Sequence, residues 1–252
     1  MVKIIHIHGF KCAGTTFERT LLREFDDLLL IESKDSGRRL LFEEIPKNLL
    51  HLSSISSHLL SPFYESDALQ IALIRDPYKR LVSAWKFTRK VENTNEKLKD
   101  FIGNYKNSMI SNYQSKLLSV QTKSDLFNRG WNINLDLNFL YSKDFFVGLV
   151  ERYDESMVII EHRMKQRDVI IDLSYPQKAN TTSNILPKKK IPDLRRFAYP
   201  SIDCDQWIWD LTNSKIDEEI KGIKSFDKKL QNFHERCKES KFTKKERSPI
   251  KI

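Results

Sequence analysis

Residues 3–17 read KIIHIHGFKCAGTTF. The run from Lys3 to His8 is β-rich and alternates between two faces, which predicts a short strand. Gly9 ends this run, and from Thr15 onward apolar residues recur at helical spacing. These residues are Phe17, Leu21, Leu22 and Phe25. The stretch therefore predicts strand, loop and helix, and the N–H groups and dipole of the helix start favour an anion at the loop.

The loop has the glycine spacing of a nucleotide-binding P-loop but not its lysine. Gly9 and Gly14 match the pattern G-x-x-x-x-G-K-[ST], yet Thr15 stands where the lysine belongs. A lysine occurs earlier, at Lys11, as a mobile point charge, and the threonine hydroxyls add donors. The loop thus suits an anionic group other than the triphosphate of ATP. The simpler alternative is a helix N-cap beside a solvated lysine.

Composition predicts a globular protein with a sizeable core. Of 252 residues, 40% are hydrophobic and 31% are charged, and no apolar run has the length of a membrane span. The first strand begins too early for a signal peptide, so the expected location is cytoplasmic, unless the chain is trimmed from a membrane-anchored parent. Three widely spaced cysteines (Cys12, Cys204 and Cys237) argue against a disulfide framework.

The net charge of +9 is concentrated late in the chain. Lysines at 188–190, arginines at 195–196 and a basic run at 241–251 could attract nucleic acid, anionic lipid or acidic glycans. We expect a single domain over residues 1–237 and a basic, flexible tail over residues 238–252. The basic loop is the better candidate for contact with an anion.

A second strand-loop-helix unit follows, with a buried strand at 69–74 and then Arg75-Asp76-Pro77. Proline suits the first turn of a helix. A third buried strand is expected at 144–150, and long helices at 95–120 and 204–237. Apolar strands that alternate with helices predict an α/β fold with a parallel sheet covered on both faces. Because ligands gather at the carboxyl ends of such strands, both corners should face one site.

The second corner offers a guanidinium and a hydroxyl. Arg75 leaves the end of the strand and Ser83 lies in the next helix, so both could hold a phosphate oxygen. Asp76 could instead bind a metal ion, but the adjacent arginine makes this less attractive. The alternative is a surface arginine on a turn, with Ser83 at a helix interface.

Three segments resemble the PAPS-dependent sulfotransferases, and in particular the glycan-type branch that includes heparan sulfate 2-O-sulfotransferase. Residues 8–17 (HGFKCAGTTF) look like the family's 5′-phosphosulfate loop, P-K-T-G-G-T-S. Residues 75–85 (RDPYKRLVSAW) are similar to its 3′-phosphate motif, R-D-P-x-x-R-x-x-S-x-[YW]. Residues 147–156 (VGLVERYDES) match a G-L-x-E-R-[FY]-D-E-S segment. Phe10 in place of proline, and Cys12-Ala13 in place of Thr-Gly, are departures.

The resemblance implies a three-layer, P-loop-like fold with a central parallel sheet flanked by helices. It implies PAPS as sulfuryl donor, no metal, and a hydroxyl acceptor, with a sugar or polysaccharide favoured over nucleic acid. Lys11 would stabilise the departing 5′-phosphate, and Arg75 with Ser83 would hold the 3′-phosphate. The remaining donor contacts would come from Cys12, Ala13, Gly14, Thr15 and Thr16, and from Thr181 and Lys188 in a late loop.

Sulfuryl transfer to a hydroxyl needs a base, and histidine suits neutral pH. By the resemblance, His58 occupies the place of the family's base before the strand that leads to Arg75, and His51 is its nearest rival. His6 and His8 share a strand face, but without a matching cysteine or carboxylate cluster we expect no metal site. Residues 112–116 (NYQSK) resemble a segment along the acceptor cleft, or could form the solvent face of a helix.

Two other functions stay open at this point. One is a P-loop kinase acting on a small molecule, which would depend on magnesium and ATP. The other is a catalytically silent module that binds anionic glycans or nucleic acid through its basic segments, with steep salt dependence. The acceptor's identity is not readable from the sequence, because fold does not specify substrate.

Overall fold

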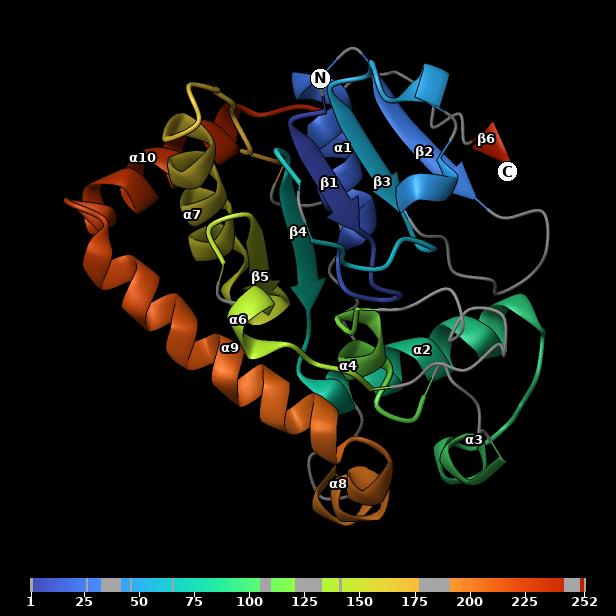
Figure 1. The fold of residues 1–252 in the computed structure, drawn as a ribbon. Helices are drawn as coiled ribbons and strands as arrows, with labels where there is room; N and C mark the ends of the chain where they lie inside the picture. The colour runs from blue at the N-terminus through green and yellow to red at the C-terminus, as the bar shows by residue number, and fades with distance from the viewer. Residues whose placement is uncertain are drawn as a thin grey trace.

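The computed structural model describes residues 2–25, 27–32, 42–45, 47–64, 66–104, 110–120, 133–140, 142–176, 191–242 and 250–251. Its centre is a six-stranded sheet in the order β5-β4-β1-β3-β2-β6, with every pairing parallel (Figure 1). The strands are β1 (Ile4–Ile7), β2 (Leu28–Glu32), β3 (Ser54–Ser57), β4 (Leu69–Ile74), β5 (Phe145–Leu149) and β6 (Ile250–Lys251). The expected α/β class is confirmed.

Helices surround the sheet, and α7 and α9 pack against β5. The longer helices are α1 (Gly14–Glu24), α2 (Pro77–Val91), α7 (Tyr153–Lys165), α9 (Asp203–Gly222) and α10 (Phe226–Glu239). The shorter ones are α3 (Leu98–Asn104), α4 (Tyr113–Leu117), α6 (Leu137–Leu140) and α8 (Ile191–Ala198). No helix among the described residues has the length and apolar character needed to cross a membrane.

Strands β1 and β4 are buried on both faces, as their nearly continuous apolar sequences predict. Strand β3 is different, because its sequence SISS is polar yet every residue is buried. Two of its three serines have partners: Ser57 Oγ donates to the carbonyl of Ile31 at 2.9 Å and Ser56 Oγ donates to Glu18 at 2.8 Å, whereas Ser54 Oγ has no partner among the described residues. The strand was not predicted from the sequence, because SISS lacks the apolar pattern that identifies a buried strand.

Two predicted helices are wrong in extent. The expected helix at 95–120 is replaced by the short helices α3 and α4, and residues 105–109 lie outside the described part of the chain. The expected helix at 204–237 is broken between α9 and α10, where Ser225 adopts φ 56°. Ile223 and Phe226, on the two sides of this break, are both buried in the core. The apolar spacing thus continues across the break and conceals it in the sequence.

The domain boundary at residue 237 stays a prediction. Helix α10 continues to Glu239, and within the expected tail β6 pairs with β2 through Ile250 opposite Ile31. Residues 243–249 are not among those described.

Candidate active site

The predicted site residues follow three adjacent strands at one edge of the sheet. The Lys11 loop follows β1, Arg75 follows β4, and His58 follows β3, which pairs with β1 on the side away from β4. Parallel strands end at the same edge, so these three segments converge there. His51 precedes β3 and therefore lies toward the opposite edge. The structure thus separates the two rival histidines.

The loop after β1 is held in an unusual backbone conformation. Lys11 and Ala13 have φ values of 63° and 61°, a left-handed region that costs a non-glycine residue about 1 kcal/mol. The Cys12 N–H donates to the carbonyl of Gly9 at 3.2 Å, and the Thr16 N–H donates to that of Ala13 at 3.0 Å. Such strain persists only where the surroundings enforce it, and it is typical of functional loops.

Three consecutive backbone N–H groups at the start of α1 have no backbone acceptor among the described residues. They are the N–H groups of Ala13, Gly14 and Thr15. Donors of this kind at a helix start form an anion-binding concavity. Cys12 and Thr16 donate their N–H groups to carbonyls within the loop, and the anion contacts expected of residues 12–16 stay a prediction.

Gly14 is required by a close approach rather than by its φ angle. A Cβ atom at this position would lie 2.0 Å from both Cδ2 and Nε2 of His8. The imidazole of His8 therefore packs against the Cα atom of Gly14. Gly14, the second glycine of the loop, thus leaves room for the His8 side chain at the end of β1.

Lys11 is half-buried among aromatic rings. Its Nζ atom lies 4.5 Å from the ring centre of Phe87 and 5.9 Å from that of Phe10. Burial lowers the pKa of Lys11, and the nearby Arg75 guanidinium lowers it further. Phe10 replaces the family's proline, and its N–H is held by the Tyr113 hydroxyl at 2.9 Å. A hydrogen bond therefore takes over from a proline ring in fixing the start of the loop.

Gln114, in α4, ties the two corners together. Its buried Oε1 accepts from the Arg75 N–H at 2.6 Å and from Cys12 Sγ at 3.4 Å, and its Nε2 donates to the Arg75 carbonyl at 2.8 Å. Burial raises the pKa of the Cys12 thiol to about 12, so this residue acts as a neutral donor. The neighbouring Ser115 is anchored in turn by the buried carboxylate of Asp205. The solvent-face alternative for residues 112–116 is therefore wrong for Tyr113, Gln114 and Ser115.

The Arg75 side chain has an unsatisfied donor. Its Nε is buried and has no hydrogen-bond partner among the described residues, and Glu151 Oε1 lies 4.0 Å away. A guanidinium held in this way is suited to a phosphate. Ser83 lies half-buried in α2. Asp76 caps α2, since its carboxylate accepts from the Lys79 N–H at 2.8 Å and from Arg195 at 2.8 Å.

The third motif segment is mainly structural. A Cβ on Gly148 would lie 2.8 Å from Leu73 Cδ2 and 2.9 Å from Ser156 Cβ, so β5 must approach both closely. Ser156 Oγ accepts from the Leu149 N–H at 3.1 Å. Glu151 accepts from the Asp76 N–H at 3.0 Å and so links this segment to the second corner.

Behind His58 lies a buried polar cluster. His58 Nδ1 donates to the carbonyl of His8 at 2.8 Å, and the two rings stack with centroids 3.7 Å apart. His8 Nδ1 lies 2.7 Å from Glu18 Oε1, which also accepts from Ser56 Oγ at 2.8 Å. Ser56 Oγ in turn contacts His6 Nδ1 at 2.8 Å.

The expectation that no carboxylate accompanies His6 and His8 is wrong. Glu18 supplies one, and its oxygen lies within 4.8 Å of ligand atoms of both histidines. Sequence reasoning missed Glu18 and Ser56 because each stands alone in its segment. The only signal was position: Glu18 lies one turn after Gly14, on the side of α1 that faces the sheet.

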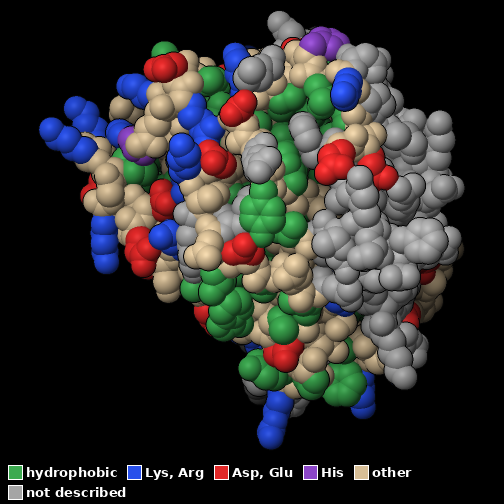
Figure 2. Space-filling view, in the orientation of Figure 1, with side chains coloured by type: hydrophobic (Ala, Val, Ile, Leu, Met, Phe, Trp, Pro, Cys, Tyr) green, Lys and Arg blue, Asp and Glu red, His purple; other side chains and the backbone are tan. Residues whose placement is uncertain are grey.

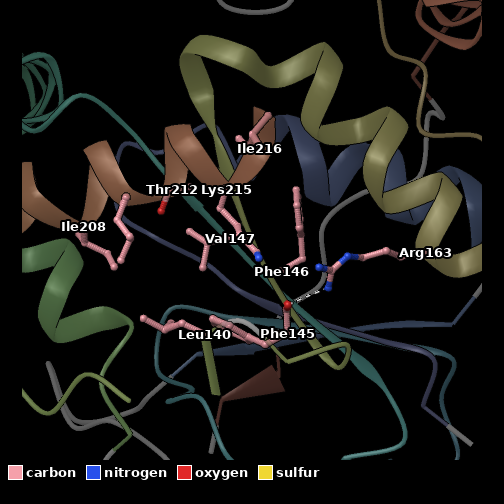
Figure 3. A pocket seen from close by; sticks show the side chains of 10 residues that line it. Leu140, Phe145, Phe146, Val147, Arg163, Ile208, Thr212, Lys215 and Ile216 are labelled. Atoms are coloured by element: carbon pink, nitrogen blue, oxygen red, sulfur yellow. Dashed lines mark hydrogen bonds between the residues drawn. The ribbon is translucent and has the colours of Figure 1, made fainter. Parts of the chain in front are cut away.

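Two predicted donor contacts, Thr181 and Lys188, lie outside the described residues. A small cavity of about 20 Å³ occurs elsewhere, between β5, α6 and α9 (Figure 3). It is lined mostly by apolar side chains such as Val147 and Ile216, and it could hold little more than one water molecule. It is a packing gap and is separate from the site.

Comparison with known proteins identifies the class. Residues 2–242 match the sequence model of the Sulfotransferase family, so the chain belongs to that family and is a sulfotransferase. One similar solved structure is a sulfotransferase from Alicyclobacillus acidocaldarius, with 13% identity over 82% of this chain and 95% of that chain, and a TM-score of 0.43. No curated protein matches this sequence. The narrower resemblance to heparan sulfate 2-O-sulfotransferase stays a prediction.

Proposed function

We propose that the protein transfers the sulfuryl group of PAPS to an acceptor hydroxyl, with His58 as the base. The observation that carries the proposal is the convergence of three strand ends. Three groups follow neighbouring strands: Lys11 with the N–H groups of residues 13–15, Arg75, and His58. Among the described residues, those N–H groups have no backbone acceptor and Arg75 Nε has no hydrogen-bond partner. Two anion-binding corners and one base are what a transfer requires when the donor carries two separate anionic groups and the acceptor is an alcohol.

The geometry favours PAPS over ATP as the donor. Thr15 stands where a kinase has its phosphate-binding lysine, and the carboxylate that follows β4 is already engaged as a helix cap by Lys79 and Arg195. A magnesium-dependent kinase would need that carboxylate for its metal. Arg75 and Ser83 offer instead a grip for a second phosphate, the 3′-phosphate that distinguishes PAPS.

The proposed reaction is an in-line displacement at sulfur. His58 donates its Nδ1–H to the His8 carbonyl, so Nε2 is the atom that takes the acceptor proton. The acceptor oxygen bonds to sulfur while the bond from sulfur to the bridging oxygen breaks, and that electron pair remains on the 5′-phosphate. Lys11 and the N–H groups of residues 13–15 stabilise the charge that develops there.

We propose a carbohydrate hydroxyl as the acceptor, on the strength of the motif resemblance. The rival function, a silent anion-binding module, would need a strong basic patch. On the face shown in Figure 2, basic and acidic side chains are intermixed. That face therefore offers no continuous basic patch for the silent module, and the acceptor's own charge stays open.

Calorimetric titration with PAP, the desulfated product, tests the donor directly. We expect micromolar binding in the presence of EDTA, and much weaker binding of ATP under the same conditions. Tight ATP binding that requires magnesium, with no response to PAP, would support the kinase instead. A screen of sugar acceptors with labelled PAPS then tests transfer.

A further inference from the structure

The cluster behind His58 contains a carboxylate whose role the reaction scheme does not yet use. Glu18 is 2% exposed, lies in α1 and hydrogen-bonds to His8 and Ser56. Isolated buried carboxylates are costly, so such groups are retained where they have partners or a task. Here the partners lead directly to the proposed base.

We propose that Glu18 is a positioning residue that acts through His8 on His58. It fixes the His8 ring, on which His58 stacks, and it stabilises the imidazolium that forms when His58 takes the acceptor proton. This inference rests on the proposed function, because it assigns Glu18 a task in that reaction.

The first argument is geometric. Ser56 and His8 hold Glu18 Oε1 at 2.8 and 2.7 Å, so the carboxylate and the His8 ring have fixed positions. Gly14 closes the edge of the His8 ring, since even a methyl group would collide with it. His58 is then oriented twice by the same residue, through the hydrogen bond to the His8 carbonyl and through the stacked ring. Such support keeps a base in one tautomer and one orientation.

The second argument is electrostatic. Burial acts to raise the pKa of Glu18, but the hydrogen bond and attraction of His8, the attraction of His6 and the hydrogen bond from Ser56 outweigh it and bring the pKa to about 2. Glu18 is therefore an anion throughout the working pH range. His6 in β1 and His8 just after it act on Glu18 directly, and His58 after β3 interacts with His6. The cations of the proposed site are Lys11 and Arg75, which act on each other. A buried negative charge near His58 favours its protonated form.

The distances argue for a hydrogen-bonded network rather than a metal site. The ligand atoms of His8 and Glu18 are 2.7 Å apart, a hydrogen-bond distance. Two ligands of one tetrahedral zinc ion, each about 2.0–2.1 Å from it, lie more than 3 Å apart. Metal binding would therefore require the existing bonds to be broken.

The test compares Glu18→Gln with Glu92→Gln in the full chain. Glutamine keeps the volume and one acceptor oxygen but removes the charge, and Glu92 is an exposed carboxylate at the end of α2. The pKa of His58 is measured by NMR titration in the absence of substrate, with the signal assigned from a His58→Gln variant. We expect Glu18→Gln to lower this pKa by about 0.5–1 unit, and Glu92→Gln to leave it unchanged.

The second measurement is the pH dependence of kcat in the Glu18→Gln variant. In Glu18→Gln the acidic limb of the kcat profile should move to lower pH and kcat should fall about tenfold, while PAP affinity stays the same. An unchanged His58 pKa would overturn the proposal, as would a metal ion bound stoichiometrically by the purified protein. If the wild type transfers no sulfuryl group, the proposed function fails while the effect on the His58 pKa can still be read.

A wild-type measurement covers the case in which Glu18→Gln does not fold. Two-dimensional spectra of the ring nitrogens should show neutral His58 with its proton on Nδ1, as the bond to the His8 carbonyl requires. They should also show His8 protonated on Nδ1, toward Glu18. A proton on Nε2 of neutral His58 would overturn the orienting role of this cluster.

Discussion

At the scale of single residues, the site depends on which histidine lies at the carboxyl edge of the sheet. His58 follows β3 directly and contacts the His8 carbonyl, whereas His51 precedes β3. In the sequence the two are seven positions apart and chemically equivalent. Only His58 lies beside the loop that follows β1, because the strand between the two histidines separates the two edges.

We expect His58→Gln to reduce kcat by about 10²–10⁴-fold, the usual contribution of a general base. PAP affinity, measured by calorimetry, should be unchanged. His51→Gln is the matched control and should retain wild-type turnover. Equal losses in the two variants would contradict the assignment.

Gly14 offers a second residue-scale prediction. Gly14→Ala forces a methyl group into the His8 ring, and we expect a loss of about 1–3 kcal/mol in stability, the usual cost of overpacking. Transfer should fall too, because the ring supports His58. Gly103→Ala in α3 is the control, since a Cβ there meets nothing within 4 Å. Thermal melting of both variants checks this, and a Gly14→Ala protein as stable as Gly103→Ala would refute the close approach.

At the scale of elements, the two loops after β1 and β4 have separate tasks in the proposed reaction. Lys11 stabilises charge that develops only during transfer, whereas Arg75 holds a phosphate that is charged throughout. The two loops are neighbours because β1 and β4 pair directly, with Ile7 opposite Ala72.

This difference should appear in kinetics. Lys11→Ala is expected to lower kcat by about 10²–10³-fold with little change in PAP affinity. Arg75→Ala is expected to weaken PAP binding at least tenfold, the loss of about one charged hydrogen bond. Calorimetry and steady-state assays on both variants separate the two effects. The opposite pattern would exchange the roles of the two residues.

Helix α4 is the element that joins these loops, through Gln114. Gln114→Leu keeps the size of the side chain but leaves the Arg75 N–H and carbonyl without their partner. We expect a loss of about 2–3 kcal/mol in stability and weaker PAP binding. Gln231→Leu, on the exposed face of α10, is the control and should change neither. Urea unfolding measures the stability and calorimetric titration measures the PAP affinity. Wild-type values of both for Gln114→Leu would contradict the linking role of Gln114.

At the scale of the whole molecule, the buried carboxylate of Glu18 links stability to pH. Its pKa falls from an ordinary value of 4.5 to about 2 in the folded protein. A group with a depressed pKa stabilises the fold above its unfolded pKa, and that contribution is lost as the pH falls through the folded pKa. We therefore expect Glu18→Gln to be less stable than the wild type at pH 7, with a difference that shrinks between pH 4.5 and 2. Urea midpoints across this range measure it, and a constant difference would contradict the shift.

Much of the architecture could be predicted from local patterns. The strands at 4–7, 69–74 and 145–149 and the helices that follow them were predictable, because buried parallel strands are continuous apolar runs. Strand β3 was not, because it lacks an apolar run, and the partners of its buried Ser56 and Ser57 lie far away in the sequence. The break at Ser225 was also hidden, since the apolar spacing continues on both sides of it.

The sequence alone determined the family and the two corners that are proposed to bind anions, because each motif is contiguous and its chemistry is local. The tertiary structure decided what lies between the motifs. It put His58 rather than His51 at the carboxyl edge of the sheet, where the site is proposed, brought Glu18 to His8, and set Gln114 between the two loops. These contacts join residues from different elements, and they exist only because the order of the strands brings those elements together.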